Sequence, residues 1–559
     1  MTLLDKIKVD PRDKKLLFTF FAVGIALLVI AGVMALLMLL VRTPAISIGS
    51  PTFYYRTLTG HSIFMFIFWL GFVQTGLLIT AGTVLIGRSL WSRRLGWTGF
   101  WFMVTGAVSA GVGILLGAET SYTVPVPLSA QYEGTPLIYL AFIMLSIGMG
   151  LIVINFIMTM VGAVEHRGSF SSWAAFLRDI PISSFAAIAG LFIAVPGLIL
   201  ALKVFIPAFL WSVGLLYTDP ISIIYYANSY RLNWHVIFHI YHYMPALTLV
   251  GVAYILVELT ADAKSIYPKQ IAKALFLLYP FFVPPTFLYH LLVDPNIPQG
   301  IKSIGSTLSL LVGTPTILHM FIILGMLEAR IRSAGHGFLT WMRHLPWGNP
   351  AFGSMAMGIV TLAAGGVLSY MLIQEQLAPV LHNTFAVPAY IHPMAAGGAN
   401  LIYMGAIYYG VTILTGRQLW GLAIAKVQPY LMAGALLLMA IFGSLAGLAG
   451  VPRRIASITL AGDAPASWVP LMNLTLGVGG MLAVLAGALF ILVIVMTALA
   501  GKRVSTVQEM IHGMAPAAMP TMVKHKTTPA ALLTIGIFIV VIMALTVLGF
   551  MALNLVPMR

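Results

Sequence analysis

Apolar segments long enough to cross a membrane recur from one end of the chain to the other. The hydrocarbon core of a bilayer is about 30 Å thick, so an apolar run of about 18 residues or more predicts a spanning helix. No polar stretch is long enough for a second domain, so residues 1–559 are expected to form a single all-α, polytopic transmembrane domain. The pattern predicts about 13 spans, near 16–41, 57–86, 95–117, 136–162, 183–213, 232–259, 270–291, 302–328, 350–374, 384–413, 427–450, 470–500 and 527–555.

The first span is interpreted as a retained helix rather than a signal peptide. It is long, no small-residue cleavage site follows it, and further spans come after it. Composition agrees with a membrane protein, because 60% of the residues are hydrophobic and 8% are charged. About a quarter of the residues of a soluble protein are charged.

The net charge of +15 could suggest a nucleic-acid partner, but the placement of the basic residues indicates membrane topology instead. Lys and Arg concentrate before the first span and in every second connection, whereas 118–135 and 375–383 contain neither. By the positive-inside rule, the N-terminus is expected in the cytoplasm and the C-terminus outside. Examples are Lys6, Lys8, Arg12, Lys14 and Lys15; Arg88, Arg93 and Arg94; Lys264 and Lys269; Arg330, Arg332 and Arg343; Lys502 and Arg503.

The chain has no cysteine, which excludes disulfides, iron–sulfur clusters and a thiolate copper site on it. Redox chemistry would therefore need histidine or tyrosine ligands. With the predicted topology, several such groups and two arginines fall at one depth, in the outer half of the bundle. They are His61, His239, His290, His392 and the pair Arg453-Arg454.

A histidine inside a membrane is costly unless it binds something. His61 and His392 could bind a haem iron from its two faces, which would give a six-coordinate centre that transfers electrons. Alternatively, both could hydrogen-bond to neighbouring carbonyls. Tyr390 lies two residues before His392, about 200° away around a helix, so the two should face nearly opposite sides. Pro393 predicts a kink here, because proline removes a backbone hydrogen bond.

Three histidines form a stripe on a second predicted helix. His235, His239 and His242 fall at i, i+4 and i+7, on one face, and Tyr243 lies four residues after His239. A metal could be bound by His239 with Tyr243 beside it, or by His235 and His239 without a tyrosine. The third interpretation is an aromatic helix with polar tips at the membrane interface.

Four motifs resemble subunit I of the haem-copper oxidases, nearest the B-type cytochrome c and quinol oxidases, and the resemblance covers almost the whole chain. That family is an all-α membrane bundle of similar span number. The motifs are Tyr54-Tyr55-Arg56-Thr57-Leu58-Thr59-Gly60-His61, Leu345-Pro346-Trp347-Gly348-Asn349-Pro350-Ala351-Phe352, His382-Asn383-Thr384 and Val451-Pro452-Arg453-Arg454.

The resemblance implies a low-spin haem held by His61 and His392. It also implies that Arg453 and Arg454 bind the haem propionates, whose charge suits guanidinium groups. The pair could instead anchor the chain at lipid headgroups. His382, in the third motif, is a further residue expected to bind the cofactor.

The resemblance also implies an oxygen site. In the family, a His-x-x-x-Tyr supplies a copper ligand and a tyrosine cross-linked to it that delivers an electron and a proton to oxygen. His239 and Tyr243 match that spacing. The family has two adjacent histidines where this chain has Tyr289 and His290, so a copper or iron near His239 and His290 would lack one ligand, which His235 or His242 could replace.

Tyr390 stands where the family has a histidine. A phenolate can ligate a haem iron, so Tyr390 could hold a second haem and take part in catalysis, or it could be a packing residue.

Ser309, Thr316 and His319 fall on one face of a predicted helix, at i, i+7 and i+10. The resemblance implies a proton path along them. Single serines and threonines also commonly bond back to their own helix.

The resemblance implies a respiratory membrane oxidoreductase in a prokaryotic-type cytoplasmic membrane. Quinol or cytochrome c would supply electrons through other oxidase-complex subunits, including a separate electron-entry subunit. The electrons would pass through the His61/His392 haem to a modified haem–metal site that reduces oxygen, coupled to proton movement. Two alternatives remain: a one-haem electron-transfer or scaffold subunit without gas chemistry, and a nitric-oxide-reductase-like enzyme.

Overall fold

Long helices form along the apolar runs because a backbone inside a membrane must satisfy its own hydrogen bonds. The computed structural model describes residues 9–119, 133–216, 227–264, 268–284, 286, 292, 298–374, 376–459 and 463–514, without the side chains of 227–235 and 242. Within these ranges, ten helices are long and apolar enough to cross a membrane. The expected all-α, polytopic fold of an integral membrane protein is confirmed.

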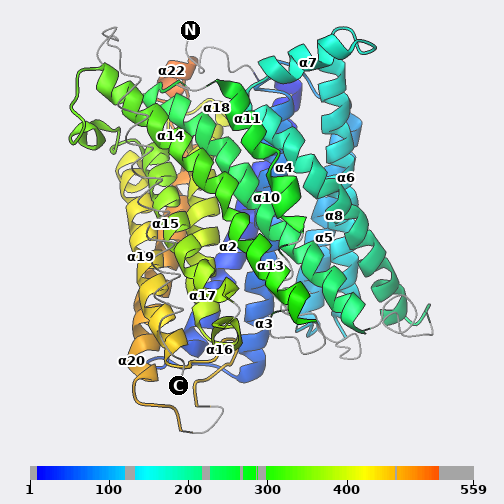
Figure 1. Ribbon diagram of the computed structural model, residues 1–559, viewed down its shortest axis with the longest axis vertical. Coiled ribbons are helices and arrows are strands. Elements are labelled where there is room, and N and C mark those ends of the chain that lie inside the picture. Colours follow the sequence, from blue (N-terminus) through cyan, green and yellow to red (C-terminus); the bar gives the residue numbers. More distant parts are fainter. Residues whose placement is uncertain are drawn as a thin grey trace.

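The helices follow one another as Figure 1 labels them. Their bounds are α2 Pro11–Arg42, α3 Pro51–Ser62, η1 Ile63–Trp69, α4 Leu70–Gly82, α5 Arg93–Leu115, α6 Thr135–Ala163, α7 Phe170–Asp179, α8 Ile182–Ser212, α10 Ala227–Ala261, α11 Lys269–Phe276, α12 Tyr279–Phe282, α13 Gln299–Leu311, α14 Gly313–Ser333, η3 Trp341–His344, α15 Pro350–Ile373, α16 Ala378–Leu381, α17 Ala386–Ile391, η4 His392–Ala399, α18 Asn400–Thr415, α19 Leu422–Leu448, α20 Trp468–Met472, η5 Asn473–Gly480, α21 Met481–Ala500 and α22 Val507–Met510.

The expected number of about 13 spans is not established by the described residues. The expected span 384–413 corresponds to α17, η4 and α18 in succession and is not among the ten. The span near 270–291 is only partly described, and the one near 527–555 lies outside the described residues.

The helices stand side by side, with α7 and α22 at one end of the bundle and α16 and α20 at the other (Figure 1). Small residues allow close packing between neighbours, as is typical of membrane helices. A methyl group on Gly99 of α5 would come within 2.8 Å of the Gly148 carbonyl of α6. In the interior, the Tyr403 hydroxyl of α18 donates to the Pro245 carbonyl of α10 at 3.1 Å.

Three of the long helices contain a π-helical segment. These are η1 after α3, η4 between α17 and α18, and η5 between α20 and α21. Pro393 is the second residue of η4, so the expected backbone irregularity takes the form of a π segment. Such segments are rare and frequently occur at functional sites. All three contribute residues to one cavity.

The first helix is fixed at its start by two carboxylates. Asp13 is buried and accepts hydrogen bonds from Arg93 Nε and the Leu90 amide, both at 2.9 Å. Asp10 caps α2 and pairs with Arg93 at 3.1 Å, and a hydrogen bond from the Ser89 hydroxyl lowers the pKa of Asp10. These bonds hold the N-terminal end of α2 against the start of α5, and α2 forms one wall of the cavity.

Candidate functional site

Two imidazoles face each other across the interior of the bundle. His61 lies in the last turn of α3, and His392 is the first residue of η4. Their ring centroids are 6.5 Å apart and their planes differ by 6°. Residues 331 positions apart in the chain are therefore brought into one parallel arrangement.

Each of these histidines uses Nδ1 for a backbone hydrogen bond. His61 Nδ1 lies 3.1 Å from the Ala31 carbonyl of α2, and His392 Nδ1 lies 2.8 Å from the Pro388 carbonyl. A carbonyl only accepts, so each Nδ1 carries the proton and each Nε2 keeps its lone pair. The hydrogen bonds to carbonyls, which the sequence analysis gave as the alternative to haem binding, are therefore present. They do not exclude a metal, because a metal-binding histidine usually donates its other ring N–H to such an acceptor.

The spacing of the two rings fits one iron atom. Imidazole–metal bonds are about 2.0 Å long and the ring centroid lies about 1 Å behind the nitrogen, so two imidazoles on one metal have centroids about 6 Å apart. The 6.5 Å separation matches this value. The residues present thus fit a bis-histidine haem, and His61 and His392 would hold it.

The rings open into a cavity of about 680 Å³, within the size range of pockets for small molecules and cofactors. Its wall is mainly apolar and comes from α2, α3, η1, α4, α17, η4, α18, α19, η5 and α21. Asn400 is a polar exception, held by a 3.0 Å hydrogen bond from Trp69 Nε1. Five methionines are part of the wall, namely Met38, Met65, Met404, Met432 and Met439.

Arginines line the cavity towards the end of the bundle that holds α16 and α20. Arg453 and Arg454, expected from the sequence, line it together with Arg42, which the sequence did not indicate. Arg454 has φ of 61°, a left-handed conformation that costs a non-glycine residue about 1–2 kcal/mol. Such strain is maintained only where neighbouring contacts enforce it.

The segment 383–385 provides some of these contacts. The Arg453 amide donates to the Asn383 carbonyl at 3.0 Å, and the Phe385 amide donates to the Val451 carbonyl at 2.7 Å. His382 itself lies beside Asn383, with 3.3 Å between Nδ1 and the amide oxygen, and does not line the cavity. The third motif therefore positions the arginine turn through its backbone.

Tyr390 points away from this cavity. Its side chain is buried among Leu372, Leu381 and Val387 and is not part of the cavity wall. The side chains of His392 and Tyr390 thus point to different sides of the same helical segment.

His239 and Tyr243 are neighbours on α10, with ring centroids 4.3 Å apart. His239 is buried, and its Nε2 contacts the Thr286 hydroxyl. His290 and the side chains of His235 and His242 lie outside the described residues. Among the residues that the structure describes, no group of three or more His, Cys, Asp or Glu side chains could hold a metal ion.

The three residues expected to form a proton path lie in one continuous helical span, Gln299–Ser333. Ser309 belongs to its first part, α13, and Thr316 and His319 belong to its second part, α14; only Val312, whose backbone is also helical, lies between the two. Ser309 Oγ bonds to the Gly305 carbonyl at 2.6 Å, as many helical serines do, and approaches the Thr286 carbonyl at 3.3 Å.

Two tyrosines that the sequence analysis did not single out contact the polar residues of this span. Tyr279 and Thr316 hydroxyls are 2.7 Å apart, and the Tyr254 hydroxyl lies 3.0 Å from His319 Nδ1. His319 is buried, and its Nε2 has no partner within the described part of the chain. Tyr254 lies eleven residues after Tyr243, about three helical turns, so their shared face was a signal available in the sequence.

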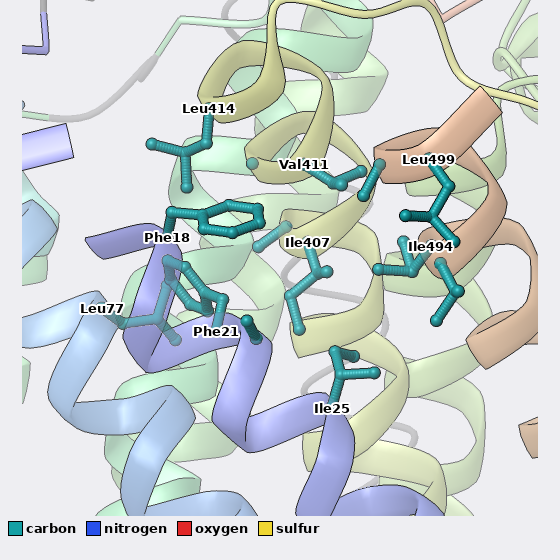
Figure 2. A pocket seen from close by; sticks show the side chains of 14 residues that line it. Phe18, Phe21, Ile25, Leu77, Ile407, Val411, Leu414, Ile494 and Leu499 are labelled. Carbon is teal, nitrogen blue, oxygen red and sulfur yellow. The ribbon is translucent and has the colours of Figure 1, made fainter. Parts of the chain in front are cut away.

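A second, smaller cavity of about 200 Å³ lies between α2, α4, α18 and α21 (Figure 2). Its side chains are all apolar, among them Phe18, Phe21, Ile407 and Leu499, and it shares Val495 with the larger cavity. It offers a ligand no polar or metal-binding side chain.

Comparisons with known proteins show the family and the fold of the chain. Cytochrome c oxidase subunit 1 of Thermus thermophilus is 31% identical over 303 residues, 53% of this chain and 51% of that protein, so the match spans about half of the relative. A second T. thermophilus sequence of that name is 35% identical over 78 residues, 14% of this chain and 72% of that protein.

A haem-copper terminal oxidase, solved as a dimer by cryo-electron microscopy, has the same fold, with a TM-score of 0.79 and 21% identity over 92% of this chain and 89% of its own. The sequence model described as "Cytochrome C and Quinol oxidase polypeptide I" matches residues 15–482. That match covers most of the chain, and the fold agrees over nearly all of it. The chain therefore belongs to the cytochrome c and quinol oxidase polypeptide I family, the subunits I of haem-copper oxidases.

Proposed function

We propose that this chain is the central subunit of a respiratory oxidase, in which His61 and His392 hold a low-spin haem. The observation that carries the proposal is the pair of parallel imidazoles, 6.5 Å apart, opening into a cavity lined by arginines. Haem and copper are the general cofactors of the family, and its subunits I act within membrane complexes of several subunits.

The chain's own residues would prepare this haem site. The carbonyls of Ala31 and Pro388 fix both imidazoles in the tautomer that presents Nε2 to a metal. Arg453 and Arg454 would bind the haem carboxylates, and the apolar wall would exclude water. A bis-histidine haem supplies one-electron transfer and binds no gas.

The second site would be built around His239 and Tyr243. Their rings are in contact, and Tyr390 would approach this region from the helix that carries His392. Tyr390 would be the ligand of a second haem, and His239, with His290 and either His235 or His242, would bind copper or iron. Quinol or cytochrome c would deliver electrons through a partner subunit, and oxygen would be the acceptor.

Protons would reach this site along α14 and α13. His319 and Tyr254 lie nearest the proposed cytoplasmic side, Thr316 and Tyr279 follow, and Thr286 connects to His239 and approaches Ser309. Each of these groups can donate and accept a hydrogen bond, which a proton relay requires. The buried Nε2 of His319 is available to an ordered water.

A one-haem electron carrier is the alternative that one observation favours. Tyr390 is packed among Leu372, Leu381 and Val387, as a purely structural tyrosine would be. In that case the chain would retain the His61/His392 haem and lack gas chemistry.

Haem stoichiometry combined with a carbon monoxide difference spectrum of the purified complex distinguishes the two functions. Carbon monoxide binds only to a haem with a free coordination position. We expect two haems per chain, one of which shifts with carbon monoxide. A single haem that does not respond would reject oxygen reduction and leave the electron-carrier function.

A further inference from the structure

The smaller cavity, between α2, α4, α18 and α21, is a groove in the lipid-facing side of the bundle (Figure 2). Two side chains of its wall, Phe18 and Leu499, are 38% and 70% exposed. A methyl group on Gly410 of α18 would lie more than 4 Å from every described atom of the neighbouring helices. The volume of about 200 Å³ is smaller than the roughly 300–1,000 Å³ of cofactor pockets. A groove of this kind suits a single hydrocarbon chain.

Three of the four helices that form the groove carry a basic residue about one turn beyond their last side chain in its wall. The pairs are Phe18 and Lys14 on α2, Leu414 and Arg417 at the end of α18, and Leu499 and Lys502 at the end of α21. Residues three or four positions apart are neighbours on a helix. Leu414 and Leu499 lie towards the same end of the groove, away from Ile25 (Figure 2). The basic residues therefore gather at the end of the groove where α2 begins and α18 and α21 end.

The backbone brings two arginines together at this end. Arg417 and Arg503 are partners in an antiparallel bridge. The bridge is formed by the Gln418 amide donating to the Lys502 carbonyl at 2.9 Å and the Val504 amide donating to the Gly416 carbonyl at 3.0 Å. Arg417 and Arg503 are thus a pair without hydrogen bonds to each other, the arrangement in which opposite side chains lie closest. Like charges directly opposite each other destabilise such a pair.

These positive charges are not neutralised by the described residues. Among them, no carboxylate lies within ion-pair distance of Arg417, Lys502 or Arg503. Glu509 follows in the chain, but its carboxylate accepts hydrogen bonds from the amide and hydroxyl of Thr506, at 3.2 and 2.9 Å. Arg417 Nη1 donates to the Gly501 carbonyl at 2.7 Å, which fixes the side chain without removing its charge. An anion at this place would relieve the repulsion.

From the groove and the charges at its end we propose a binding site for one anionic phospholipid. An acyl chain lies in the groove beside Gly410, and the phosphate is bound by Arg417 and Arg503, since guanidinium groups bind phosphate with two hydrogen bonds. Lys14 and Lys502 add to the attraction, because basic residues at a membrane surface attract anionic lipids. A lipid with a choline headgroup carries its own positive charge and gains less from this cluster. The site does not depend on the haem.

The test is photo-crosslinking in the purified complex, reconstituted in phosphatidylcholine. The probes are phosphatidylglycerol and phosphatidylcholine, each with a diazirine on one acyl chain, and mass spectrometry of peptides locates the crosslinks. Unlabelled phosphatidylglycerol, phosphatidylcholine and a quinol with an isoprenoid tail are added as competitors. We expect the phosphatidylglycerol probe to label 406–414 and 494–499, and unlabelled phosphatidylglycerol to displace it best.

Two variants remove the two halves of the site. Gly410→Leu fills the groove and should abolish labelling there. Its control is Gly434→Leu on α19, where a side chain also has open space and which lines neither cavity. The double variant Lys502→Gln/Arg503→Gln should weaken labelling by phosphatidylglycerol about fivefold for each charge removed. Its control, Arg94→Gln/Arg343→Gln, removes two exposed basic residues from helices that do not form the groove.

Three results would overturn the proposal. Equal labelling of the groove by both probes would show that the basic cluster does not select the headgroup. Displacement by the quinol but not by phosphatidylglycerol would assign the groove to a quinol tail. Unchanged labelling in Lys502→Gln/Arg503→Gln, or no labelling of the wild-type groove at all, would show that no anionic lipid is bound there.

Discussion

At the scale of single residues, the role of each histidine depends on which of its two ring nitrogens is already hydrogen-bonded. His61 and His392 resemble any membrane histidines until their Nδ1 atoms are seen to be bonded to carbonyls, which leaves the two Nε2 atoms for a shared metal. Tyr390 packs in an apolar cluster that includes Leu372, Leu381 and Val387. Its phenol is therefore the group whose role is best decided by substitution.

Tyr390→Phe keeps the ring and removes only the hydroxyl. If the phenolate ligates a second haem, this variant should lose or perturb one haem of two, and Tyr390→His should restore a more oxidase-like site with carbon monoxide binding. Haem content and carbon monoxide difference spectra measure both effects. A Tyr390→Phe protein with wild-type haem content and spectra would show that Tyr390 only packs.

At the scale of elements, the proposed proton path depends on how α13 and α14 pack against α10 and α12. Thr316 and His319 are each bonded to a buried tyrosine from another helix, so the line is assembled by tertiary contacts. Thr316→Val should leave the buried Tyr279 hydroxyl without its partner and cost about 1–3 kcal/mol of stability. Thr307→Val, on the exposed face of α13, is the control, because Thr307 bonds only within its own helix.

His319→Gln keeps a polar side chain of similar size but removes the group that can exchange protons. Turnover should fall by about tenfold to 100-fold, towards the low end of what a positioned proton-transferring group contributes. The spectrum of the His61/His392 haem should not change. Oxygen consumption by the complex, measured beside the spectrum, checks both statements; wild-type turnover would exclude His319 from the path.

Sequence reasoning located these elements but did not predict the irregular segments within them or all of the residues that line the cavity. The spacing of Ser309, Thr316 and His319 predicted one helix, and all three lie in the span Gln299–Ser333. The π segments at η1, η4 and η5 have no periodic signal, because they differ from α-helix by one residue per turn. Arg42 was missed because a single arginine after a long apolar run has the sequence pattern of a headgroup anchor.

At the scale of the whole molecule, the common depth of the histidines depends on the membrane orientation. Basic connections predict that 330–343 faces the cytoplasm and that the arginine turn at 453–454 faces outside. Because the chain has no cysteine, single cysteines can report sidedness. Thr340→Cys should react with an impermeant thiol reagent only from the cytoplasmic side, and Ser467→Cys only from the outer side. If each cysteine instead reacts only from the opposite side, the proposed proton path would lie on the outer rather than the cytoplasmic side of the haem site.

The whole fold was the part most accessible from sequence, because span length and hydropathy reflect the thickness of the bilayer and do not depend on any one contact. The pairing of His61 with His392 could be expected from their common depth and from the family motifs. Residue spacing does not specify how side chains pack between segments far apart in the chain. The parallel ring planes, the cavity that these histidines line and the contacts around Arg453 all depend on such packing.

The measurement that tests the central claim most directly is the reduced-minus-oxidised spectrum of the purified complex, taken for the wild type, His61→Ala, His392→Ala and the surface control His166→Ala. One imidazole cannot keep the iron six-coordinate. We predict a low-spin haem spectrum in the wild type and in His166→Ala, and its loss in each of the other two variants. A bis-histidine spectrum that persists in either His61→Ala or His392→Ala would contradict the assignment of these two residues as the haem ligands.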